Sequence, residues 1–307
     1  MARKESIKDI NSARGGGLPR GIRLFAAVLI FFTAASLPEL AASPAEAARI
    51  VSLYPGHTDN IVALGLGDSL VAVSQSDEED FSSGVSRLPA RVTAEAILAL
   101  EPDIVFTRSL NERADPNRRN ILERAGIAVY AIDPPSWSGF EDYLAELSGI
   151  LGINPEGTRH RFREIIAGVK ERAARHEGDP PRVFLEATSK ELRTCAPGSW
   201  AASLIELAGG VNAAPGAKPL REGSPLASWG VERTVALAKS GLDIYLVQQG
   251  AMNTATIGEI MSRPWSDALG SVRIEFIPER WLSRPSLLGI EKGSATLIEM
   301  FYGSVEK

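Results

Sequence analysis

The chain has 307 residues, of which 44% are hydrophobic and 23% are charged. This length and composition allow one large or two medium hydrophobic cores and exclude a disordered or fibrous protein. The formal net charge is −5 and no cluster of Lys and Arg occurs beyond the N-terminus, which argues against nucleic acid as a partner. The single cysteine, Cys195, and three widely separated histidines exclude a cysteine-rich or HExxH-type site. A metal site formed by the protein alone would have to rely on carboxylates, and we assign no residues to one.

The N-terminal segment has the pattern of an export signal. Residues 1–23 are rich in Lys and Arg, and the uncharged apolar run 24–35 follows them. Because this run is shorter than the ~20 residues that span a bilayer and small residues come next, we predict a signal peptide over residues 1–47 rather than a retained anchor. Cleavage is expected after Ala47, with Ala42 as the alternative. No cysteine lies nearby to carry a lipid, so the mature protein is expected to be periplasmic, soluble and not lipid-anchored.

After residue 48 the chain alternates short β-rich runs with helical stretches. This alternation predicts βαβ units and mainly parallel sheets. The runs expected to form strands are 50–53, 70–73, 103–106, 128–132, 182–186, 243–247 and 274–277. They fall into two series that are separated by residues 140–173. In this segment the apolar residues recur at helical spacing.

The two series predict an α/β fold with two Rossmann-like lobes joined by a long interlobe helix. The expected boundaries are 48–137 for the N-terminal lobe, 138–178 for the helical linker, and 179–307 for the C-terminal lobe with its terminal helix. A long helix packed along both lobes is stiff, so the expected motion between the lobes is a small twist.

Each predicted lobe contains the same short sequence motif, a glutamate at the start of a helix that leads into a strand. Glu95 opens a short amphipathic helix that leads into the strand 103–106, and Glu232 opens one that leads into 243–247. A glutamate in the first turn of a helix complements the helix dipole and is common. The matched pair, however, indicates that the two lobes are related by pseudo-symmetry.

Several short phrases, taken in order along the chain, match the pattern of one known family. In the first half they are 49–59 (RIVSLYPGHTD), 63–73 (ALGLGDSLVAV), 95–106 and 125–129; in the second they are 182–186, 207–212, 229–246 and 283–286. Together they resemble the periplasmic substrate-binding proteins of ABC importers for ferric siderophores, haem and cobalamin. The resemblance covers essentially the whole mature chain and singles out no one ligand.

The resemblance implies a monomer that holds a metal chelate, without covalent attachment, in the cleft between two lobes and delivers it to an ABC-transporter permease dimer. It also gives the matched glutamates a role, because in this family one exposed Glu at the tip of each lobe docks onto arginines of the permease. The matching positions are Glu95 and Glu232, and charge pairing of this kind sets register and association rate. The alternative is a carrier or sensor that binds a chelate but docks no importer.

Ligands of parallel α/β lobes meet the loops at the carboxyl ends of the strands. The residues that we expect to bind the ligand are therefore Tyr54, His57, Gln75 and Arg108 in the first lobe and Trp200, Trp229, Gln249, Arg280, Trp281 and Arg284 in the second. Aromatic rings suit a large flat chelate. Arginines could hold its carboxylate, catecholate or propionate groups, and Tyr54 or His57 could ligate an iron or cobalt centre.

The arginines favour a ferric siderophore or a related iron complex, and cobalamin and haem remain the alternatives. Against cobalamin, Gln75 and Arg108 stand where cobalamin binders tend to carry aromatic rings; in its favour, Trp229 matches an aromatic position of those binders.

An enzyme is not expected from this sequence. Ser199, His57 and Asp133 could be imagined as a triad, but the sequence has no G-x-S-x-G elbow. Its glycine-rich stretches fit neither a P-loop nor a dinucleotide-binding fingerprint.

Overall fold

The structure is a computed structural model that describes residues 48–78 and 84–303. The described residues belong to one compact unit. The signal peptide predicted over residues 1–47 lies outside them. Among the described residues, no helix is both long enough and apolar enough to cross a membrane.

The first half of the chain forms a five-stranded parallel sheet in the order β3-β2-β1-β4-β5. The strands are β1 (Ile50–Ser52), β2 (Leu70–Ser74), β3 (Ser86–Leu88), β4 (Ile104–Thr107) and β5 (Ala128–Ala131). The helices that accompany them are α1 (Pro55–Ala63), α2 (Ala94–Leu98), α3 (Ser109–Ala114) and α4 (Pro116–Arg124). The central strand β1 is buried along its whole length, as is usual for parallel sheets that helices cover on both faces.

The second half forms a four-stranded parallel sheet in the order β12-β11-β6-β8 and a small antiparallel sheet in the order β7-β10-β9. The strands are β6 (Arg182–Glu186), β7 (Thr194–Cys195), β8 (Val211–Asn212), β9 (Lys218–Pro219), β10 (Leu226–Ser228), β11 (Ile244–Gln249) and β12 (Arg273–Pro278). The helices are α7 (Trp200–Leu207), α8 (Val231–Lys239), α9 (Ile257–Met261), α10 (Glu279–Leu282) and α11 (Ser294–Tyr302), with a π-helical turn over Gly289–Gly293 before α11.

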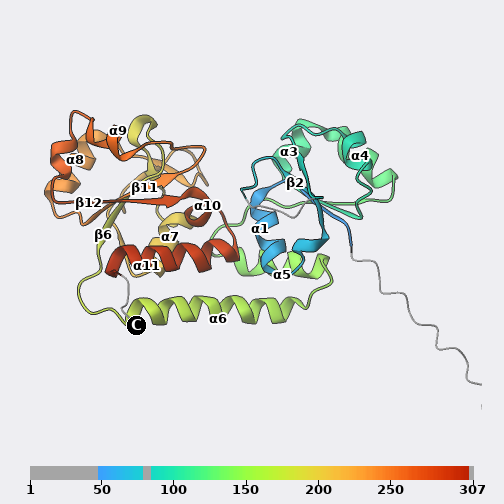
Figure 1. The fold of residues 1–307 in the computed structure, drawn as a ribbon, viewed down its shortest axis with the longest axis horizontal. Coiled ribbons are helices and arrows are strands. Elements are labelled where there is room, and N and C mark those ends of the chain that lie inside the picture. The colour runs from blue at the N-terminus through green and yellow to red at the C-terminus, as the bar shows by residue number, and fades with distance from the viewer. Residues whose placement is uncertain (1–47, 79–83, 304–307) are drawn as a thin grey trace, which may run out of the picture. The chain divides into compact units, whose positions relative to one another are not determined.

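Two helices connect the halves, α5 (Phe140–Ile150) and α6 (Pro155–Ala174). The start of α6 is well defined, because the Asn154 side chain accepts a hydrogen bond from the Glu156 N–H at 3.1 Å and Pro155 takes the first helical position. Helix α6 runs beside α5 and α11 (Figure 1) and also contacts α7. Arg161 of α6 also donates a hydrogen bond to the Ala63 carbonyl at the end of α1, at 2.7 Å, so α6 contacts elements of both halves.

The largest apolar cluster of the described residues joins the two halves. It contains Ile50 and Phe106 in the first sheet, Leu144 in α5, and Val183 and Leu185 in the second sheet, each at most 1% exposed. Two smaller clusters each lie within one half. Because the main core is shared, burial of apolar surface stabilises the joined halves together.

The parallel α/β class predicted from the sequence is confirmed, and each of the seven predicted runs forms a strand. The structure adds β3 and the four short strands β7 to β10, which were not predicted. Strands of two or three residues are too short to show an alternating pattern.

Candidate functional site

Charged side chains from both halves meet beyond the carboxyl ends of the parallel strands. From the first half, Asp59 lies in α1 directly after β1, and Asp77 and Glu78 follow β2. From the second half, Arg280 lies in α10 directly after β12, and Arg284 follows α10. We call these five residues the ionic cluster.

The ionic cluster is held by contacts between residues more than 200 positions apart. Arg284 Nη1 lies 3.5 Å from Asp59 Oδ2, and its Nη2 lies 3.2 Å from Glu78 Oε1. Arg280 Nη2 lies 3.8 Å from Asp59 Oδ1, and its Nε lies 3.9 Å from Glu78 Oε2. Asp59 is 2% exposed and the two arginine side chains are 12% and 14% exposed, so water screens these charges little.

Asn60 connects helix α1 to the segment that follows α10 through uncharged hydrogen bonds. Its Nδ2 donates to the Pro285 carbonyl at 3.1 Å, and its Oδ1 accepts from the Leu287 N–H at 3.0 Å. The residue is fully buried, where an amide that lost these partners would be costly. Helix α1 and the segment after α10 are thereby fixed against each other, and the ionic cluster lies next to this attachment.

Tyr54 and Arg108 adjoin the ionic cluster. The Tyr54 ring folds over Gly56, where a Cβ would collide with it, and the Arg108 guanidinium lies 4.7 Å from the ring centroid. Burial raises the pKa of Tyr54, whereas the nearby charges of Arg108 and Arg284 lower it. Arg108 Nε is buried and has no hydrogen-bond partner in the described part of the chain.

Asp77 carries the clearest electrostatic perturbation of this site. Its Oδ2 accepts a hydrogen bond from Thr58 Oγ1 at 3.3 Å. Burial, followed by the neighbouring Asp59 carboxylate, raises the pKa of Asp77 to about 7. At neutral pH this carboxyl group is therefore only partly ionised.

The shift of Asp77 predicts a pH dependence of stability. The unfolded chain releases this proton at about pH 4, so between about pH 4 and 7 the native state holds a proton that the unfolded state has lost. The free energy of unfolding should therefore fall as the pH rises through this window. Asp77→Asn removes the effect and should be more stable than the wild type by about 2 kcal/mol at pH 8, with little difference at pH 4. Urea unfolding at the two pH values measures this, and an equal difference at both would contradict it.

His57 lies in the core rather than in the cleft. It is 0% exposed; its Nε2 donates to the Ile132 carbonyl at 3.0 Å, which leaves Nδ1 to accept from the Tyr143 hydroxyl at 2.8 Å. Burial lowers the pKa of His57 to about 4, so the ring is neutral at pH 7. Both ring nitrogens are used within the fold, which argues against the metal-ligand role expected from the sequence.

Trp200 is also placed away from the ionic cluster. Its ring centroid lies 4.8 Å from that of Trp137 and 4.8 Å from that of Phe140, and the residue is 5% exposed. It belongs to the core shared by the two halves. The ligand-binding role expected for Trp200 does not fit this position.

The other predicted cleft residues lie at strand ends or in α10. Trp229 follows β10, with its ring centroid 6.0 Å from Phe184, and its indole Nε1 is buried without a hydrogen-bond partner among the described residues. Trp281 is half-buried in α10. Gln75, just after β2, and Gln249, the last residue of β11, are exposed.

Glu95 and Glu232 both occupy the first turns of exposed helices. Glu95 lies in α2 and Glu232 in α8, and both side chains are exposed. Each helix precedes a parallel strand of its own sheet, β4 and β11 respectively. The two glutamates are therefore equivalent in position in the two halves.

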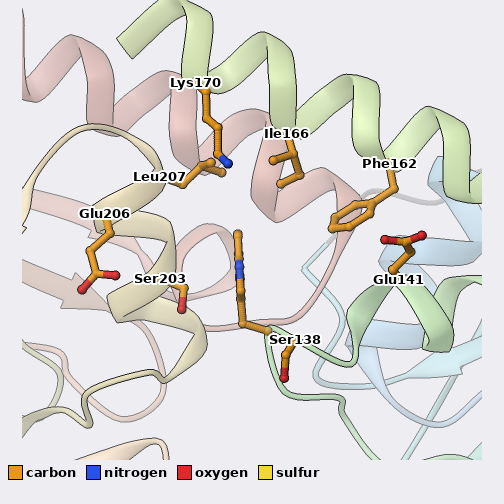
Figure 2. A pocket seen from close by; sticks show the side chains of 9 residues that line it. Ser138, Glu141, Phe162, Ile166, Lys170, Ser203, Glu206 and Leu207 are labelled. Carbon is orange, nitrogen blue, oxygen red and sulfur yellow. The ribbon is translucent and has the colours of Figure 1, made fainter. Parts of the chain in front are cut away.

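A cavity of about 540 Å³ lies beside the connecting helices rather than at the ionic cluster. Figure 2 shows Phe162, Ile166 and Lys170 extending from α6 on one side and Ser203, Glu206 and Leu207 from α7 on the other. None of the ten residues that the sequence predicts as ligand contacts lines this cavity. In the described part of the chain, no group of three or more His, Cys, Asp or Glu side chains is arranged to hold a metal ion.

Sequence reasoning missed Asp59, Asn60 and Glu78. Asp59 and Asn60 follow Pro55 by one helical turn, so a helix that starts at Pro55 turns them back toward the strand ends. A helix start at Pro55 was therefore the sequence signal that could have identified Asp59 and Asn60. Their partners are about 225 residues away, which no local pattern indicates.

Comparisons with known proteins give one consistent result. Residues 50–264 match the family model described as periplasmic binding protein. A relative named vitamin B12-binding protein, from Vibrio cholerae serotype O1, is 32% identical over 197 residues, covering 62% of this chain and 68% of the relative.

Solved structures agree at the level of the fold. The periplasmic haem-binding protein of Vibrio cholerae superposes with a TM-score of 0.67 at 19% identity, covering 84% of this chain and 100% of that chain. The periplasmic vitamin B12-binding protein of Vibrio cholerae gives a TM-score of 0.55 at 22% identity, covering 84% and 98%. The family expected from the sequence phrases is thus confirmed: the chain belongs to the periplasmic binding protein family.

Proposed function

We propose that this protein captures a metal chelate at the carboxyl edges of its two parallel sheets and delivers it to the permease of an ABC importer. The observation that carries the proposal is the meeting of these two edges at the ionic cluster, which brings Tyr54, Arg108, Arg280 and Arg284 together. Ligands of such sheets bind at this edge. The chelate is held without covalent attachment, and the protein catalyses no reaction.

The charges at this edge favour a chelate with little net charge. Arg280 and Arg284 lie near the carboxyl groups of Asp59 and Glu78, and Asp77 adds a partly ionised one. The positive charges of these two arginines are therefore opposed by carboxylates of the protein itself. An uncompensated arginine would attract an anionic ligand, whereas a balanced group does so weakly.

This balance changes the ligand favoured by the sequence alone. The arginines alone pointed to a ferric siderophore, and the carboxylates that face them point instead to a corrinoid of the cobalamin type. The relatives named vitamin B12-binding proteins, at 28% to 32% identity, support the same choice. Ferric siderophore and haem become the competing outcomes of the test.

Direct binding measurements test which chelate the protein binds. The mature protein is titrated with cyanocobalamin, haem and a ferric tris-catecholate, and any compound that co-purifies is identified by its absorbance spectrum and mass. Cyanocobalamin is expected to bind most tightly. Tighter binding of haem or of the tris-catecholate would reject the corrinoid but keep the chelate-binding function, and binding of none would reject that function.

Trp229 provides a test of where the ligand lies. Its half-buried ring and unpartnered Nε1 suit stacking on a bulky ligand, so Trp229→Ala should weaken chelate binding by about 1–3 kcal/mol. Trp137→Phe, which alters the cavity beside α6 and α7, should leave the affinity unchanged. Affinities are measured by titration after thermal unfolding has shown that both variants fold. The opposite pattern would move the ligand site to that cavity.

A further inference from the structure

Asp59 occupies an unusual electrostatic position. Its carboxylate is only 2% exposed. Arg284 Nη1 lies 3.5 Å and Arg280 Nη2 lies 3.8 Å from its oxygens, and both arginines belong to the other half. Glu78 faces the same arginines but is 49% exposed. Of these two carboxylates, Asp59 is the one whose charge water cannot screen.

We propose that Asp59 determines the charge specificity of the cleft, by neutralising Arg280 and Arg284 so that strongly anionic chelates are bound poorly. The inference rests on the proposed function and deepens it, because it names the residue that separates neutral from anionic chelates. Asp59 acts through the two arginines and need not touch the ligand.

Two chelates of different charge respond differently to the field at this edge. A charge in a partly buried site interacts through an effective dielectric constant of about 20 rather than about 80. Loss of the Asp59 charge therefore makes the field at the cleft more positive, and a trianionic chelate feels this change for each of its charges. A chelate of nearly zero net charge feels almost none of it.

Four other charged groups of the described residues lie at this edge. Glu78 is half exposed, Asp77 is only partly ionised near pH 7, and Arg108 adds a further positive charge beside Tyr54. Glu279 lies close enough to raise the pKa of Tyr54. Of the two described carboxylates that contact Arg280 and Arg284, Asp59 is the more buried, so loss of its charge should change the field at these arginines more than loss of the Glu78 charge.

The experiment measures the ratio of two affinities, for cyanocobalamin and for a trianionic ferric tris-catecholate, in full-length mature protein. Asp59→Asn keeps the size of the side chain and removes its charge. It should strengthen tris-catecholate binding by about tenfold or more and change cyanocobalamin binding by less than about threefold. Adding Arg284→Gln to Asp59→Asn removes one positive charge and should return the ratio toward that of the wild type.

Glu78→Gln is the matched comparison, since it removes a carboxylate from the same arginines at a more exposed position. It should shift the ratio in the same direction by only about twofold to threefold. If Asp59→Asn does not fold, Glu78→Gln still tests the mechanism, because an unchanged or reversed ratio in that variant contradicts it.

The outcomes separate the two proposals. If the wild type binds neither chelate, the proposed function fails and the inference fails with it. If the wild type binds cyanocobalamin and Asp59→Asn changes both affinities by the same factor, the chelate-binding function stands and the role of Asp59 is overturned.

Discussion

Arg263→Met is expected to destabilise the fold by about 3–5 kcal/mol, the largest stability effect that we predict, because it leaves the buried Glu186 carboxylate without its cation. Glu186 is 0% exposed, and Arg263 donates to it through both terminal nitrogens, at 2.6 and 2.9 Å. The Tyr245 hydroxyl and Asn253 Nδ2 also donate to this carboxylate. These hydrogen bonds remain in the variant, but they do not supply a positive charge.

Arg119→Met is the matched control. Arg119 pairs with Glu123 at 2.7 Å, and both side chains are more than 40% exposed, so this pair should contribute at most about 1 kcal/mol. The free energies of unfolding of both variants are measured by urea denaturation at pH 7. Similar losses in the two variants would show that the buried pair has no special weight.

The largest functional effect is expected when both exposed helix-start glutamates are reversed in charge. Glu95→Arg and Glu232→Arg should each leave chelate affinity nearly unchanged and reduce uptake by about tenfold, because a like charge at a rim contact slows association and costs binding free energy. The double variant should reduce uptake to the level of cells that lack the protein. Uptake of labelled chelate and affinity of the purified protein are measured side by side.

Glu171→Arg provides the control for that experiment. Glu171 is also exposed, at 69%, but lies on α6, and its reversal should not affect uptake. A loss of affinity as large as the loss of uptake in the Glu95 or Glu232 variants would refute the docking role. Normal uptake by the double variant would favour the alternative, a carrier or sensor that docks no importer.

The sequence was informative wherever the signal was local. The runs Ile50–Leu53 and Arg182–Glu186 are apolar, short and followed by turn residues, and both form central strands of parallel sheets. The helical spacing of Phe140, Tyr143, Leu144 and Leu147 correctly predicts α5, in which all four side chains are buried. Such patterns follow from burial of one helix face or of a whole strand.

The site was predicted less well because its organisation depends on distant pairs. Arg280 and Arg284 were expected near the ligand, but their partner Asp59 lies more than 220 positions away, and without it the sign of the local field is misjudged. His57 follows a Pro-Gly turn, which is usually exposed. In this chain the turn begins a helix that is buried from Pro55 to Ile61, and the imidazole becomes part of the core.

The apolar cluster shared by both halves also constrains how the chain can acquire its structure. Side chains from the first sheet, α5, α7, α11 and the second sheet belong to one cluster, so neither half can complete its core before the other is present. An isolated half would expose the apolar face that its counterpart covers and would be prone to self-association. Synthesis of the C-terminal segment is therefore the step that allows the N-terminal sheet to reach its final stability, and the chain should be most vulnerable to proteolysis before that point.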